Sequence, residues 1–233
     1  MSKVLIAAVG AAAMSVATLA QLTLARAADL PRRGAPVYDE AAYAPVPAFT
    51  WTGFYAGGLA GIGFGGFNGP GVQYFGSSPS GLEFGLTAGY NYQSGNLLLG
   101  LEGDYAWSHI ADAASPLPGV TSTGIVQNLD TVRARFGYSY DRALFFATGG
   151  YAGGSIRGVL NNARVGSVAD QSQYANGFAL GLGVEYALTS RISAKAEYLY
   201  TALGSNAYFV GTPNPTNVGA NVNTLRGGVN YHF

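Results

Sequence analysis

From Trp51 onward, apolar and polar residues alternate along the chain with a period of two. The clearest case is residues 223–233, where Leu225, Val229, Tyr231 and Phe233 share one face and polar residues occupy the other. Successive side chains of an extended strand point to opposite faces, so this segment is predicted to be a strand with one apolar and one polar face. A chain that ends on an apolar aromatic residue fits a strand whose outer face lies in lipid.

The same alternation predicts eight strands. They are expected at residues 52–64, 82–93, 97–107, 126–140, 143–152, 177–188, 192–200 and 223–233. Residues 143–152 are apolar on both faces, so the pattern does not orient that strand. Strand lengths of roughly 9–13 residues match what a tilted strand needs to cross the hydrocarbon layer.

The connections between these strands alternate in length. Tight turns are expected at 94–96, 141–142 and 189–190, and longer loops at 65–81, 108–125, 153–175 and 201–222. Outer-membrane barrels show this alternation. We therefore predict an all-β fold over residues 51–233: an eight-stranded antiparallel up-and-down transmembrane β-barrel with short periplasmic turns and four longer extracellular loops.

Charge segregation distinguishes a lipid-facing barrel from a soluble one. The charged residues of the oriented spans are expected to lie, without exception, opposite the large apolar side chains: Glu83, Glu102, Asp104, Arg133, Arg135, Glu185, Lys195, Glu197 and Arg226. A Lys or Arg at mid-bilayer on the lipid face costs roughly 2–4 kcal/mol. A soluble barrel would instead cover its outside with polar side chains. The polar face here is rich in Gly and holds few charges, which favours a crowded interior with lipid outside.

Aromatic residues gather at the strand ends, as expected for two girdles at the membrane interfaces. One rim is predicted to hold Tyr92, Tyr138, Tyr140, Tyr186, Tyr231 and Phe233, and the other Phe64, Trp107, Tyr198 and Tyr200.

The interior of an eight-stranded barrel is just wide enough to be filled by side chains. Charges shielded from water persist when they are paired and hydrogen-bonded. The nine luminal charged residues are therefore predicted to form a near-balanced ion-pair network, with Arg133 and Arg135 facing Glu102 and Asp104. This predicts a polar plug rather than an open selective pore, with a narrow small-solute pore as an alternative.

Composition agrees with β structure and narrows the classes of partner. The chain has 233 residues, including 35 Gly, 16 Tyr, 12 Phe and no Cys, and 48% are hydrophobic. Only 10% are charged and the net charge is zero, so no nucleic-acid partner is expected. After the first 25 residues, no apolar run is long enough for a membrane helix.

Residues 1–27 are predicted to be a secretory signal peptide. Lys3 supplies a positive start, residues 4–20 are apolar and Ala-rich, and Ala25-Arg26-Ala27 offers a cleavage site before Ala28. Residues 28–50, with four Pro, are predicted to be a Pro-rich periplasmic extension.

The chain also resembles a known family. The stretches FTWTGFYAGGLAGIGFG, TVRARFGYSYDRALFFATGGYA and LRGGVNYHF, with AADLP after the signal peptide, are similar to the RopB-like porin family of small alphaproteobacterial outer-membrane proteins. The resemblance covers essentially the whole mature chain. Leu59 departs from it, because the family often has a polar residue there.

This resemblance implies a barrel of the OmpA-type superfamily in the outer membrane. It also implies delivery by the barrel-assembly machinery, which reads the C-terminal aromatic strand. The expected partners are that machinery, outer-membrane lipid and lipopolysaccharide, with homo-oligomerisation left open. The function expected is a structural contribution to the cell envelope.

Catalytic, metal and cofactor sites are not expected. Ser108, His109 and Asp112 are the one cluster with hydrolase chemistry, and three such residues in an Ala-rich loop are more often just loop. With two His and no Cys, a transition-metal site has almost no ligands to draw on. His232 is predicted to be a hydrogen-bonded rim residue.

A binding role is the main alternative. The predicted long loops are rich in Gly, Ser, Asn, Pro and Tyr, and could contact host molecules, phage or a planar ligand such as haem. The resemblance allows this, because some relatives are described as haem-binding or host-interacting. The loop composition itself is typical of ordinary surface loops.

Overall fold

The structure, a computed structural model, describes residues 49–162, 166–210 and 215–233. The predicted signal peptide lies outside these residues, as does all but the end of the predicted extension at 28–50. Within the described ranges, no helix is long and apolar enough to cross a membrane.

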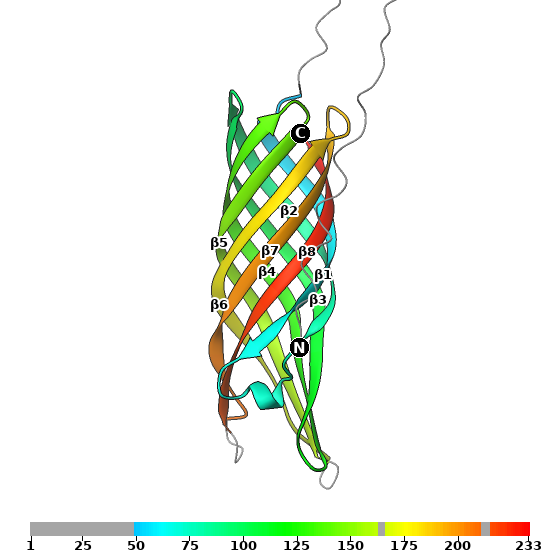
Figure 1. Ribbon diagram of the computed structural model, residues 1–233, viewed down its shortest axis with the longest axis vertical. Helices are drawn as coiled ribbons and strands as arrows, with labels where there is room; N and C mark the ends of the chain where they lie inside the picture. The colour runs from blue at the N-terminus through cyan, green and yellow to red at the C-terminus, as the bar shows by residue number, and fades with distance from the viewer. Residues whose placement is uncertain (1–48, 163–165, 211–214) are drawn as a thin grey trace, which may run out of the picture. The chain divides into compact units, whose positions relative to one another are not determined.

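Eight antiparallel strands form a closed barrel in which each strand pairs with the next and β1 pairs with β8 (Figure 1). The strands are β1 (Gly53–Asn68), β2 (Ser80–Ser94), β3 (Leu97–Leu117), β4 (Val120–Tyr140), β5 (Ala143–Asn162), β6 (Gly166–Ala187), β7 (Ile192–Tyr208) and β8 (Thr216–His232). The predicted all-β, eight-stranded barrel is confirmed. Closure leaves no open sheet edge through the membrane, so the backbone groups there are satisfied within the wall.

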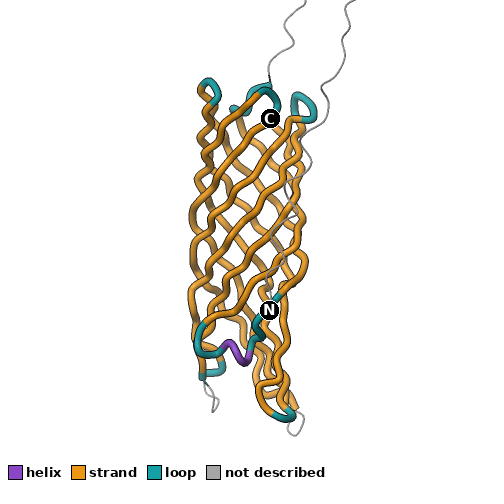
Figure 2. Tube along the Cα trace, viewed as in Figure 1, coloured by secondary structure: helices purple, strands orange, loops and turns teal. Residues whose placement is uncertain are grey.

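One end of the barrel, here called the turn end, carries the three predicted tight turns (Figure 2). Gly95 and Asp141 both adopt a positive φ, at 60° and 53°. Gly and Asp are residues that tolerate this conformation well. In the third turn the Thr189 hydroxyl accepts hydrogen bonds from the backbone N–H groups of Arg191 and Ile192. The residue types at these positions therefore allowed the turns to be predicted.

At the opposite end, here called the long-strand end, the predicted loops are mostly strand. β3 and β4 are joined by two residues, 118–119, where a loop over 108–125 was predicted. Most of the predicted 153–175 and 201–222 loops likewise belongs to β5, β6, β7 and β8. The β1–β2 connection is the longest fully described one and contains a short 3₁₀ helix, η1 (Val72–Tyr74). The prediction of four long loops was wrong in extent.

β-bulges explain why the alternation did not reveal these extensions. Register shifts occur between Trp107 and Ile110, between Val126 and Asn128, and between Leu203 and Asn206. A bulge inserts an extra residue and can reverse which residues face inward. On β4, odd-numbered residues such as Leu129 and Thr131 are buried on one side of the bulge, and even-numbered ones such as Val126 on the other.

The outer face of the barrel is apolar. Val132, Phe136 and Tyr138 on β4 are half or more exposed, whereas the luminal Arg133 and Arg135 are buried. At the usual rise and tilt of such strands, the apolar outer residues of β4 from Val132 to Tyr140 cover roughly 20 Å along the barrel axis. This is close to the ~25 Å apolar band of outer-membrane barrels.

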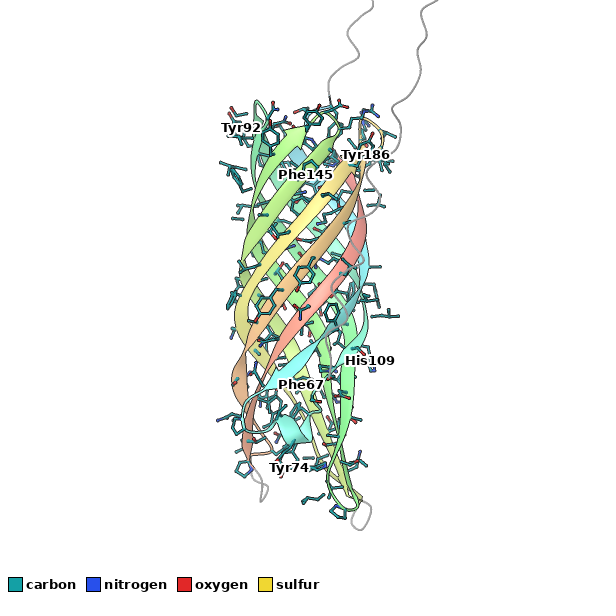
Figure 3. All side chains as sticks on the ribbon, in the orientation of Figure 1. Phe67, Tyr74, Tyr92, His109, Phe145 and Tyr186 are labelled. Carbon is teal, nitrogen blue, oxygen red and sulfur yellow. The ribbon has the colours of Figure 1, made fainter. Side chains whose placement is uncertain are left out.

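The structure also orients the strand that the pattern left open. On β5, Leu144 and Phe146 point into the lumen, where they are at most 4% exposed, while Phe145 points outward. Tyr92, Phe145 and Tyr186 lie near the turn end (Figure 3). Leu59 is buried in the lumen, as its position in the alternation indicates.

Candidate functional site

The middle of the lumen is occupied by an ion-pair layer centred on Arg133 of β4. Its Nη2 lies 2.7 Å from both Glu102 and Asp104 of β3, and its Nη1 lies 2.5 Å from Glu197 of β7. The same guanidinium donates to the hydroxyls of Thr131 and Thr148. Arg133 is 0% exposed. A planar guanidinium with five donors can serve several acceptors at once, so this one side chain ties four strands together across the lumen.

Arg135 forms a second centre, one step closer to the turn end. It pairs with Glu185 of β6, lies 3.6 Å from Glu102, and its guanidinium carbon sits 4.0 Å from the centre of the Phe146 ring. Tyr55 of β1 accepts a hydrogen bond from Arg135 and donates one, at 2.7 Å, to Glu102. Burial strengthens each of these electrostatic contacts because the local dielectric is low.

Two further cations complete the layer from β7 and β8. Lys195 Nζ lies 2.8 Å from Glu102, and Arg226 lies 2.8 Å from Glu197 and 3.1 Å from Asp104. Gly181 faces this layer, and a Cβ there would approach the side chains of Thr148, Glu197 and Arg133. The Gly-rich inner face therefore makes room for the arginine side chains.

Glu83 is the exception among the nine predicted network residues. It is 2% exposed, yet neither carboxylate oxygen has a hydrogen-bond partner among the described residues. It also forms no ion pair with any described cation within 4.0 Å. The structure therefore gathers eight of the nine residues into the network and leaves Glu83 beside it. Leaving a buried carboxylate without a hydrogen-bond partner is costly.

An apolar cluster closes the lumen at the turn end. Trp51, Leu98, Leu144, Phe146 and Ala187 are buried together, and Phe49 packs against them. The Trp51 backbone N–H donates to the Gln93 side chain, which fixes the chain where it enters the barrel. His232 lies at the rim of this cluster, and its Nε2 is 2.9 Å from the Ser193 hydroxyl.

A larger apolar cluster fills the long-strand end. Its buried residues are Phe67, Tyr74, Phe75, Ile110, Val126, Leu129, Ile156, Leu160, Ala175, Leu203, Tyr208, Phe209, Val218, Ala220 and Val222. The β1–β2 connection folds inward so that Phe75 packs its ring 4.9 Å from that of Tyr208. Ser78 holds the connection down by donating its backbone N–H to Asp112 of β3. Phe67 and Tyr74 lie at this end (Figure 3).

The lumen thus consists of a charged layer between two apolar layers. An ion moving along the axis would leave water at either apolar cluster, where it would find no compensating charges. The arrangement can hold the wall strands together from inside. The alternation did not reveal the long-strand-end layer, because Phe75, Tyr208 and Phe209 belong to segments predicted as loops. It did not reveal the turn-end layer either, because the predicted strand at 143–152, which supplies Leu144 and Phe146, is apolar on both faces.

Ser108, His109 and Asp112, the cluster expected to be ordinary loop rather than a hydrolase site, lie on β3 and are not joined to one another by hydrogen bonds. The Ser108 hydroxyl donates a hydrogen bond to the backbone carbonyl of Val126, and His109 is exposed. Asp112 accepts hydrogen bonds from the backbone N–H groups of Ser78 and Ala113. The Ser193 hydroxyl contacts His232, but it donates to Glu185 and all three side chains are buried. Among the described residues, no group of three or more His, Cys, Asp or Glu could hold a metal ion.

One charged residue in the predicted strands lies on the outer face. Asp130 of β4 shares the outward face of Val132, so the prediction that every charged residue of the oriented spans faces inward is wrong at this position. Its Oδ2 accepts a 2.6 Å hydrogen bond from the Tyr174 hydroxyl of β6. On β4, charge segregation therefore holds from Val132 to the turn end, and outward polar side chains begin at Asp130.

Sequence comparison places this barrel in a family. Residues 34–233 match the model of the outer membrane protein beta-barrel domain. The chain belongs to the outer-membrane protein β-barrel family. It is 35% identical to the 31 kDa outer-membrane immunogenic protein of Brucella melitensis, over 82% of this chain and 87% of that one. It is 33% identical to a 22 kDa outer membrane protein of Rhizobium leguminosarum, over 71% of each.

The family assignment places the protein in the outer membrane, as the resemblance implied. Among solved structures, Neisserial surface protein A matches with a TM-score of 0.46 and 18% identity, over 78% of this chain and 98% of that one. The predicted C-terminal assembly strand corresponds to β8, which closes the barrel against β1. Its Leu225, Val229 and Tyr231 face outward, as does Phe233 directly after it.

Proposed function

We propose that this protein is a structural component of the outer membrane whose barrel is closed to ions and solutes and has no catalytic role. The observation that carries the proposal is the sequence of layers in the lumen, with the Arg133 network between two apolar clusters. Ion pairs that link β3, β4, β6, β7 and β8 from inside stabilise the wall, and this is what a protein that contributes to envelope integrity needs.

Planar-bilayer recordings of the purified mature protein test the closed lumen. The expected result is no stable, large conductance. A lasting ion-selective conductance would contradict the proposal. In cells, deletion of the gene should weaken the envelope barrier, and a barrel shortened at the β3–β4 and β5–β6 hairpins should restore it. Failure of that shortened barrel would favour recognition through the extensions instead.

In this proposal the turn end faces the periplasm and the long-strand end faces outward. The support is the alternation of tight turns with longer strand extensions. The expected partners are outer-membrane lipid, lipopolysaccharide and the barrel-assembly machinery.

A further inference from the structure

A hydrogen-bonded cluster lies on the outer wall at the first polar row beyond the apolar band. Asp130 of β4, Gly153 of β5 and Asn176 of β6 stand side by side in the sheet register. The Tyr174 hydroxyl donates to Asp130 at 2.6 Å, and the Tyr151 hydroxyl donates to Asn176 at 2.6 Å. The two hydroxyls are 3.3 Å apart. We call these four side chains, Asp130, Tyr151, Tyr174 and Asn176, the tyrosine platform.

The platform is built around Gly153. A Cβ at that position would overlap the Tyr174 hydroxyl and would lie 2.9 Å from Asp130, so any larger residue would displace the tyrosine. Gly153 faces outward but is buried, because the tyrosine side chains cover it. Tyr151 and Tyr174 nevertheless remain 44% and 46% exposed. The rings are therefore held against the wall while much of their surface stays open.

The platform has unused acceptor capacity and carries a single negative charge. Asp130 Oδ1 receives one long contact, at 3.4 Å, from Asn128. No described cation pairs with Asp130 within 4.0 Å, and Arg157, which lies further along β5, pairs with Asp170. A cluster with acceptors and no free cation suits a ligand that donates hydrogen bonds, and it does not suit a phosphate group.

The position of the tyrosine platform along the barrel axis determines which molecules can contact it. Phe178 and Val132 are the last apolar outward residues before Asn176 and Asp130, so the platform lies at head-group level and faces sideways in the membrane plane. With the long-strand end outward, its neighbours are the sugar head groups of lipopolysaccharide. Sugar rings offer hydroxyl donors to Asp and Asn, and C–H faces to aromatic rings.

We propose that the tyrosine platform binds the sugar head group of lipopolysaccharide. This inference rests on the orientation given in the proposed function but not on the closed lumen. If the barrel conducted ions, the sugar-binding proposal would still stand. If the platform bound no sugar, the proposal of a closed lumen would still stand.

The test is a titration of fluorescent lipopolysaccharide against the full mature protein in phospholipid nanodiscs. The double variant Asp130→Asn/Tyr174→Phe should weaken binding by about tenfold, as expected for the loss of charge-assisted hydrogen bonds. Gly153→Ala should weaken it as well, because the added methyl group displaces the Tyr174 hydroxyl without removing any polar group. Tyr138→Phe, which removes a hydroxyl near the turn end, is the matched control and should bind like the wild type.

Three outcomes would overturn the proposal. Equal affinity for wild type and all variants would show that the platform is only part of the interfacial aromatic belt. Complete loss of wild-type binding in chelator would show that divalent cations bridge to phosphate. Equal competition by excess phospholipid would show that no sugar is recognised. Circular dichroism, and a difference in gel mobility between heated and unheated samples, verify that each variant is folded.

Discussion

Individual buried charges in this barrel differ in what they contribute. Arg133 is fully buried and has three carboxylate partners, whereas Glu83 is 2% exposed and forms no ion pair within 4.0 Å. A buried charge stabilises a fold only where partners compensate for its removal from water. The two residues therefore predict substitution effects of opposite sign.

Arg133→Ala should lower the free energy of unfolding by about 3–5 kcal/mol, because it leaves Glu102, Asp104 and Glu197 without their shared partner. Urea unfolding in lipid vesicles measures this. The matched control is Arg157→Ala, which removes an arginine from an exposed pair and should have little effect. Similar losses for both variants would mean that the luminal network is not what stabilises the barrel.

Glu83→Gln should raise the free energy of unfolding by about 1 kcal/mol, because a neutral amide is less costly to bury than an unpaired carboxylate. Glu102→Gln, at a residue with three cationic neighbours, should lower it. The same vesicle assay compares the two. If Glu83→Gln destabilised as much as Glu102→Gln, Glu83 would have a partner that compensates its charge.

At the scale of elements, the strands continue well past the apolar band on one side of the barrel. β4, β5 and β6 stay paired out to Val120, Asn162 and Gly166, with register shifts on the way. Polar residues such as Asp130 and Asn176 appear on their outer faces beyond Val132 and Phe178. Beyond the membrane these hairpins depend on side-chain contacts in water, and exposed contacts are weak. The Arg157–Asp170 pair is one such contact, with two hydrogen bonds at 2.7 and 2.5 Å.

This pair predicts a pH dependence. The hydrogen bonds from Arg157, together with its charge, hold the pKa of the Asp170 carboxyl below its usual value. A lowered pKa in the folded state means that the pair supports the hairpin above about pH 4, the usual Asp value. That support is lost as the pH falls through the folded pKa.

In the wild type, carbon-13 NMR should therefore show the Asp170 carboxyl titrating below about pH 4. Arg157→Gln should move the midpoint back towards the usual value. An unchanged midpoint in that variant would show that Arg157 does not set the Asp170 pKa.

For the whole molecule, the proposed closure of the lumen to ions and solutes depends on three layers in series. Either apolar cluster lies between the Arg133 network and water. Removing one layer should therefore leave the others closed. Permeability should respond to single substitutions much less than stability does.

Liposome-swelling assays with small sugars check this prediction. Liposomes that contain Phe75→Ala, in the long-strand cluster, or Trp51→Ala, in the turn-end cluster, should swell no faster than liposomes with the wild type. Leu86→Ala on the lipid-facing wall serves as the control for a general loss of packing. Rapid swelling with Phe75→Ala alone would mean that this cluster is the only barrier.

Local chemistry alone determined the strand count, the turns and the inward position of the nine luminal charged residues. Two-residue alternation and turn-forming residues such as Gly95 and Asp141 act within a few residues of chain, so a single sequence displays them. The tertiary structure decided which charges meet, because Arg133 and Glu197 come together only when the sheet closes. It also decided the strand extensions, where bulges reverse the alternation, and the inward folding of Phe75. Those features depend on register and closure, which are set by the whole ring of strands rather than by any one of them.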